Sequence, residues 1–127
     1  MTESFEINAL ASCFAAHRRL FEAASTLSRR LAGVHDDADL LRLGGSCMRI
    51  AAHDALQARD PRQTLRSWRE CALAERQVRL ATFHALRDGC IEADVYDQIF
   101  ELARKAARIR EDERQRLRRQ LLLLAIV

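Results

Sequence analysis

Residues 60–89, DPRQTLRSWRECALAERQVRLATFHALRDG, contain the clearest helix start and helix stop in the chain. Asp60 is a favourable N-cap residue, and Pro61 has the backbone torsion that the first helical position needs. Gly89 stands where a left-handed residue commonly ends a helix. Between these signals, apolar residues from Trp68 to Leu86 recur at the three- and four-residue spacing of a helix face. The stretch therefore predicts a helix over residues 61–88.

The sequence on either side predicts three more helices by the same signals, over residues 4–32, 38–58 and 93–125. Gly33 can end the first of them, and either Asp36 or Asp37 can cap the second. Gly44 and Gly45 lie in the middle of the second helix, where glycine costs helix propensity. We therefore expect the backbone of another helix to approach closely at these glycines.

Composition supports the same fold class. Four Gly and one Pro in 127 residues are too few for an all-β fold with its frequent turns, and 49% hydrophobic residues can supply a core. Amphipathic helices joined by short loops pack most simply as an antiparallel up-down-up-down four-helix bundle. We therefore expect an all-α fold in a single domain that spans residues 1–127.

Three features of the sequence bear on localisation. The N-terminal residues lack the basic stretch and the uninterrupted apolar run of a secretory signal. The longest apolar run, residues 121–127, is far shorter than the roughly 20 residues of a membrane-spanning helix. The four cysteines are scattered and include no CxxC pair, which is typical of reduced thiols. These features predict a cytoplasmic protein without membrane contact.

Cys13 and His17 are candidates for a metal-binding pair, because their four-residue spacing places them on one helix face. They also lie along the apolar stripe of the first predicted helix, where a buried thiol beside a hydrogen-bonded histidine is the commoner arrangement. The chain contains no GxSxG, HExxH or Glu-x-x-His motif and no Gly-rich phosphate loop. We therefore predict no catalytic residue, no cofactor and no metal.

Arginine is the most informative residue type. Residues 61–127 carry a net charge of +4, and five arginines of the third predicted helix fall within an arc of about 80°. Guanidinium groups bind phosphates through charge and paired donors, although local ion pairs such as Glu111 with Arg114 can also use them. Glu75 falls on the inner face of its helix, so we expect a structural ion pair with Arg79. The candidates for nucleic-acid or interface contacts are Arg62, Arg66, Arg69, Arg76, Arg87, Arg110, Arg114 and Arg118.

Apolar residues are interleaved with these arginines, a pattern typical of a subunit interface. A single bundle cannot cover every apolar face, and the apolar end of the chain would be exposed on a monomer. The sequence therefore predicts a homo-oligomer. The candidate interface residues are Leu65, Leu73, Leu80, Phe83, Leu121 and Leu124.

Four stretches of the chain resemble a known protein family: SCMRIAA at residues 46–52, WRECA at residues 68–72, ALRDG at residues 85–89 and VY at residues 95–96. This family consists of four-helix-bundle proteins encoded in intervening sequences of bacterial large-subunit ribosomal RNA genes. Accessory proteins of diversity-generating retroelements are related to it. The resemblance covers about residues 40–110 and implies a helical bundle, assembly into pentameric rings and no established enzymatic activity.

Two functions are consistent with these features. The first is a non-catalytic oligomeric scaffold that binds RNA or DNA through the arginine-rich faces of the third and fourth helices. The second is a protein–protein interaction module whose arginines serve subunit assembly only. The two differ in whether the arginines remain exposed and unpaired after assembly or pair with carboxylates across subunits.

Overall fold

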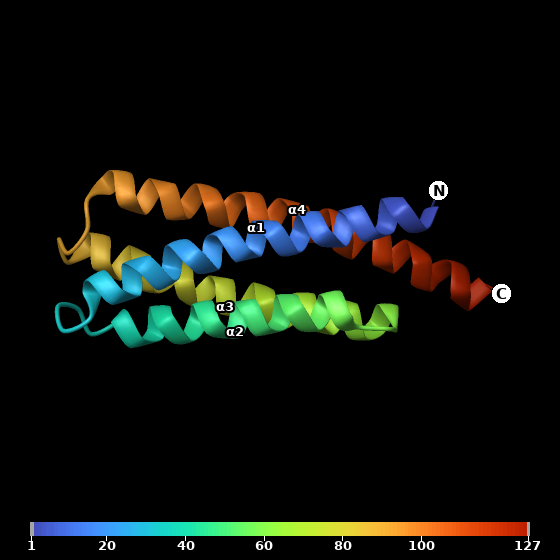
Figure 1. Cartoon of the computed structure of the whole chain (residues 1–127), viewed down its shortest axis with the longest axis horizontal. Coiled ribbons are helices and arrows are strands. Elements are labelled where there is room, and N and C mark those ends of the chain that lie inside the picture. The colour runs from blue at the N-terminus through green and yellow to red at the C-terminus, as the bar shows by residue number, and fades with distance from the viewer. Residues whose placement is uncertain (1, 127) are drawn as a thin grey trace.

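The computed structural model describes the backbone of residues 2–126 and the side chains of residues 9–125. Within that range the chain forms four α-helices and no strand, so the all-helical prediction is confirmed (Figure 1). Each helix end lies within two residues of its predicted position. The helices are α1 (Thr2–Leu31), α2 (Ala38–Gln57), α3 (Pro61–Arg87) and α4 (Ala93–Ile126).

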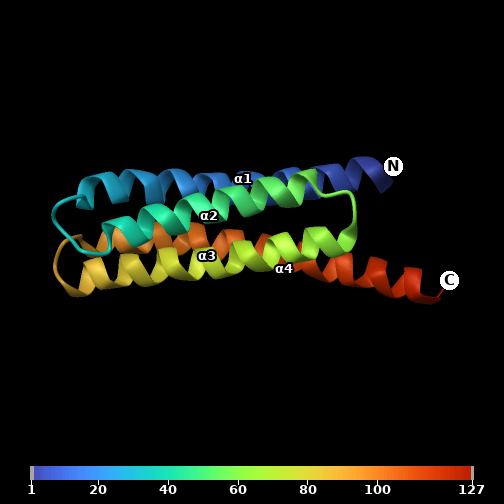
Figure 2. The ribbon, with the colours of Figure 1, turned by 90° about the horizontal axis from the view of Figure 1, so that it is seen from below.

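Each helix packs against two others: α1 and α3 both contact α2 and α4. Consequently α1 lies diagonally opposite α3. In Figures 1 and 2, the α1–α2 and α3–α4 loops lie at one end of the molecule and the α2–α3 loop lies at the other. The last turns of α4 extend beyond the start of α3 in both views.

The ends of α3 have the predicted chemistry. The Asp60 carboxylate accepts a hydrogen bond from the backbone N–H of Arg62 at 2.9 Å, with Pro61 in the first turn. At the other end Gly89 has φ 72°, and the backbone N–H of Cys90 donates to the Ala85 carbonyl at 2.8 Å. This bond, together with the one from the Gly89 N–H to the Leu86 carbonyl, forms a Schellman motif. The chain is thereby turned sharply into α4.

Helix α2 begins at the predicted residue, but its N-terminal cap differs from the prediction. Asp37 occupies the N-cap position, but its side chain makes no capping hydrogen bond. Its carboxylate instead contacts Nδ1 of His84 on α3, and His35 Nε2 contacts the Asp88 carboxylate at 2.8 Å. The expected capping role is therefore wrong for Asp37. Asp37 and His35 both contact the C-terminal end of α3, because the α1–α2 loop lies beside that end.

Close packing between α2 and α3 explains the glycines in α2. A Cβ atom at Gly44 would lie 3.2 Å from Val78 Cγ2 and 3.3 Å from the Ala74 carbonyl oxygen, both on α3. At Gly45 the nearest atom would be Ala24 Cβ on α1, at 3.6 Å. The expected close approach of a backbone is therefore confirmed at Gly44. This close approach packs α3 directly against the backbone of α2.

Candidate functional site

A buried ion pair joins α3 to α4. The Glu75 side chain is 1% exposed, and its Oε1 accepts a hydrogen bond from Arg110 Nη1 at 2.9 Å. Arg110 Nη2 lies 3.5 Å from the second carboxylate oxygen. The predicted partner, Arg79, also contacts this oxygen, with its Nε at 3.5 Å. The predicted local pair is therefore present, but the closer partner of Glu75 comes from another helix.

His17 on α1 completes this buried network. Arg110 Nη1 lies 3.0 Å from His17 Nε2, and His17 Nδ1 lies 2.7 Å from the Cys13 carbonyl oxygen. Since arginine can only donate, Nε2 is the acceptor and Nδ1–H is the donor, which identifies a neutral imidazole. Burial lowers the pKa of His17, consistent with this form. Both ring nitrogens are therefore occupied by structural hydrogen bonds.

The two buried thiols belong to the same region. Burial raises the pKa of the Cys71 thiol to about 12 and raises the pKa of Cys13 further. Cys71 Sγ donates to the Met48 carbonyl at 3.5 Å. Cys13 Sγ lies 3.9 Å from His17 Nδ1, whose N–H is donated to the Cys13 carbonyl oxygen. Within the part of the chain that the structure describes, no group of three or more His, Cys, Asp or Glu could hold a metal ion.

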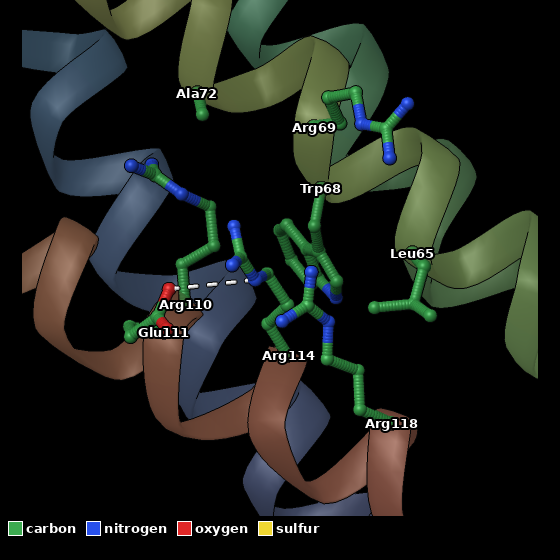
Figure 3. A pocket seen from close by; sticks show the side chains of 8 residues that line it. All are labelled: Leu65, Trp68, Arg69, Ala72, Arg110, Glu111, Arg114 and Arg118. Atoms are coloured by element: carbon green, nitrogen blue, oxygen red, sulfur yellow. Dashed lines mark ion pairs between the residues drawn. The ribbon is translucent and has the colours of Figure 1, made fainter. Parts of the chain in front are cut away.

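On the outer side of this network, α3 and α4 enclose a pocket of about 170 Å³ (Figure 3). We call it the arginine pocket. Figure 3 shows that the guanidinium groups of Arg114 and Arg118 reach from α4 toward the indole of Trp68 on α3. The lining residues are Leu65, Trp68, Arg69, Ala72, Arg110, Glu111, Arg114 and Arg118.

Trp68 separates the arginine pocket from the buried network. Its side chain is 1% exposed, and its ring packs against His17 with the centroids 5.3 Å apart. Trp68 Nε1 is the one buried side-chain nitrogen or oxygen of the described residues that has no hydrogen-bond partner. Because buried donors are normally paired, this N–H is an unused donor at the wall of a cationic pocket.

The charges of the arginine pocket are only partly balanced. Arg114 Nε lies 3.6 Å from the Glu111 carboxylate, which confirms the predicted local pair, and both side chains are about half exposed. Arg69 and Arg118 are exposed and form no ion pair with any described residue. Arg110 is neutralised by Glu75. The mouth of the arginine pocket therefore carries three guanidinium groups and one carboxylate.

The other predicted arginines do not line this pocket. Arg62, Arg66 and Arg76 are exposed along α3 without an ion pair to a described residue. Arg87, at the end of the same helix, contacts the neighbouring Asp88 carboxylate at 3.0 Å. Four of the eight candidate arginines therefore line the arginine pocket, and the other four lie along the outer face of α3.

The predicted interface residues lie in different surroundings. Leu73, Leu80 and Phe83 are about half exposed on α3. Leu65 packs against the core and lines the arginine pocket. On the last turns of α4, Leu121 is half-buried and Leu124 is exposed.

Two features of the candidate site were not predicted from the sequence. One is Trp68 as the wall of a cationic pocket, and the other is Arg110 as the main partner of Glu75. The predicted inner-face position of Glu75 is the signal that a charge is buried on this side of α3. No local signal identifies Arg110, because it lies 35 residues away from Glu75.

Comparisons with known proteins identify no relative. No protein-family model matches the chain. No curated protein matches it, and no solved structure matches it. Among the described residues, no helix is both long enough and apolar enough to cross a bilayer.

Proposed function

We propose that this protein is a non-catalytic scaffold that binds nucleic acid through the arginines of α3 and α4. In this proposal the chain belongs to the family that it resembles, packs as an antiparallel up-down-up-down bundle and assembles into cytoplasmic homo-oligomers. The observation that carries the binding role is the arginine pocket. Three guanidinium groups there, on Arg69, Arg114 and Arg118, are opposed by the single carboxylate of Glu111.

The exposed arginines of α3 extend this basic surface. Arg62, Arg66 and Arg76 have no ion pair among the described residues, so their guanidinium groups are available to phosphates. Phosphate contacts of this kind supply most of the affinity of sequence-independent nucleic-acid binding. The alternative would instead pair these arginines with carboxylates of a neighbouring subunit. The two proposals therefore differ in whether the arginines stay exposed after assembly.

The buried network is consistent with the proposed non-catalytic scaffold. Cys13 and Cys71 are protonated near neutral pH because burial raises the pKa of both thiols. Both nitrogens of His17 are engaged, so it offers no free base. Glu75 is held by two arginines. The polar groups at the centre of the bundle thus stabilise the fold and leave no activated nucleophile among them.

Fluorescence anisotropy with a structured RNA and a DNA duplex tests the binding role. We expect binding that weakens steeply between about 50 and 300 mM salt, because each phosphate contact contributes a slope of about −0.9. The variant R69Q/R114Q/R118Q should reduce that slope by about three, roughly one for each contact removed. The matched control, R18Q/R19Q/R29Q, removes the same charge from exposed positions of α1, diagonally opposite α3. Absence of binding at the lowest salt would contradict the proposal.

The second candidate function is a protein–protein interaction module. Leu73, Leu80 and Phe83 favour it, because these large apolar side chains are about half exposed on the same helix as the arginines. Light scattering at micromolar concentration tests self-association. A monomeric mass would contradict the homo-oligomer, and an oligomer without nucleic-acid binding would support the second function over the first.

A further inference from the structure

We propose that the arginine pocket binds a terminal phosphate, a phosphomonoester at the end of a nucleic-acid strand. This inference rests on the proposed function and specifies which chemical group the pocket selects. The remaining arginines of α3 would contact internal phosphates of the same strand. Three observations on the arginine pocket carry the inference: its charge, its size and its unused donor.

The charge of the arginine pocket matches a dianion. Arg69, Arg114 and Arg118 contribute three positive charges and Glu111 contributes one negative charge, which leaves two positive charges. Arg110 is left out of this sum because it contacts the buried Glu75 at 2.9 Å, and the second arginine on Glu75, Arg79, does not line the pocket. A phosphomonoester carries about −1.5 to −2 near pH 7. An internal phosphodiester carries one negative charge and would leave one positive charge unmatched.

The size of the arginine pocket is compatible with this ligand. A volume of about 170 Å³ is enough for a phosphate group with bound water. The small side chain of Ala72 and the apolar side chains of Leu65 and Trp68 complete the lining.

The unused donor lies at the wall of the arginine pocket. Trp68 Nε1–H has no partner among the described residues, and Arg114 and Arg118 point toward its ring (Figure 3). A phosphomonoester offers three strong acceptor oxygens. Guanidinium groups can take two of them in paired hydrogen bonds, and in this proposal the indole turns so that Nε1–H donates to the third.

Trp68 is the only tryptophan in the chain, so its fluorescence reports on this pocket. The first experiment titrates the full-length protein with methyl phosphate and with dimethyl phosphate at constant ionic strength near pH 7.5. These probes differ in charge at the same phosphorus centre. We expect the dianion to bind with a Kd roughly tenfold lower than the monoanion. Equal, weak responses to both probes would overturn the inference.

The second experiment compares one single-stranded RNA in three forms: with a 5′-phosphate, with a 3′-phosphate and with hydroxyl groups at both ends. A nucleoside monophosphate is the fourth ligand. We expect a phosphorylated strand to bind roughly tenfold more tightly than the hydroxyl strand. The preference should vanish in R114Q/R118Q and persist in R18Q/R19Q, which removes two exposed arginines from α1.

The outcomes separate the inference from the proposed function. Equal, salt-dependent binding of all three RNA forms would overturn the terminal-phosphate inference and leave nucleic-acid binding in place. Binding of the nucleoside monophosphate without binding of any RNA would overturn both the proposed function and the inference that the ligand is the end of a strand. The pocket would then be assigned to a small phosphomonoester. Helix content measured by circular dichroism checks that each variant is folded, which we expect because the substituted side chains are exposed.

Discussion

Arg110 and Arg114 stand one turn apart on α4, yet their environments are opposite. The Arg110 side chain is 12% exposed and forms a two-point contact with a buried carboxylate. The Arg114 side chain is 45% exposed and lies 3.6 Å from a carboxylate on its own helix. The same residue type is therefore a core component at one position and a solvent-exposed cation at the next. The difference follows from where the partner carboxylate lies.

This contrast separates stability from binding. An ion pair in the core is costly to break, because the remaining charge has no water to solvate it. An exposed pair is worth little, because water and salt screen it. A guanidinium group that contributes little to stability remains available to a ligand. We therefore expect substitutions at the buried network to affect folding and substitutions at the arginine pocket to affect binding.

The largest effect is expected for Arg110→Ala. This change leaves Glu75 buried with only the longer contact to Arg79, so the free energy of unfolding should fall by about 3–5 kcal/mol. Urea denaturation followed by circular dichroism measures the loss. The control is Arg114→Ala, which should cost less than about 1 kcal/mol.

Replacing both partners of the buried pair sharpens this test. If the loss in Arg110→Ala comes from an unpaired charge, the double variant E75L/R110M should recover most of it. The buried carboxylate is then gone, and Arg79 is exposed enough to be solvated. Equal losses in the single and double variants would assign the effect to packing instead.

The second prediction concerns the reactivity of Cys71. Its thiol is buried beside Arg110, whereas Cys47 is exposed on α2. In the native protein a thiol reagent should modify Cys47 rapidly and Cys71 only through opening of the bundle. Because about 3 kcal/mol corresponds to roughly a hundredfold in an equilibrium constant, Arg110→Ala should accelerate labelling of Cys71 by about that factor. An unchanged rate would show that Cys71 reacts without unfolding.

The third prediction concerns pH. The pKa of His17 is lowered in the folded protein, so the unfolded chain takes up the proton first as the pH falls. The stability that the neutral imidazole contributes is fully present above its ordinary pKa of about 6.5 and is lost below it. Between about pH 7.5 and 5.5, the free energy of unfolding should fall by at most about 1.4 kcal/mol per pH unit from this group.

His17→Gln separates this effect from the other titrating groups. Glutamine can still accept from Arg110 but does not titrate, so the variant should show a weaker pH dependence over the same range. The variant leaves the contacts of His35 with Asp88 and of His84 with Asp37 in place, so the comparison isolates His17. Identical pH profiles of the variant and the parent would contradict a role for His17.

The smallest effect on stability is expected for Arg118→Ala. This exposed side chain has no ion pair among the described residues, so the free energy of unfolding should change by less than about 0.5 kcal/mol. Binding of methyl phosphate should nevertheless weaken measurably, by roughly tenfold for a lost charged hydrogen bond. A large loss of stability would place Arg118 with the structural arginines and break the contrast between the two regions.

Local signals in the sequence predicted most of the fold. Asp60, Pro61 and Gly89 bound α3 as expected, because capping and left-handed turns depend on residues next to each other in the chain. The Glu111–Arg114 and Glu75–Arg79 pairs were predicted for the same reason. The contact of Asp37 with His84 was not predicted, because His84 lies on another helix.

The sequence by itself determined the four helices, their ends, the close approach at Gly44 and the need of Glu75 for a cationic partner. These features depend on spacing along one helix, on backbone conformation or on side-chain size. Only the tertiary structure decided that Arg110 satisfies Glu75, that His17 is neutral, and that Trp68 meets Arg114 and Arg118 at one pocket. The physical reason is that the rotation and register of packed helices depend on contacts between distant residues. A helical-wheel diagram of a single helix does not show these contacts.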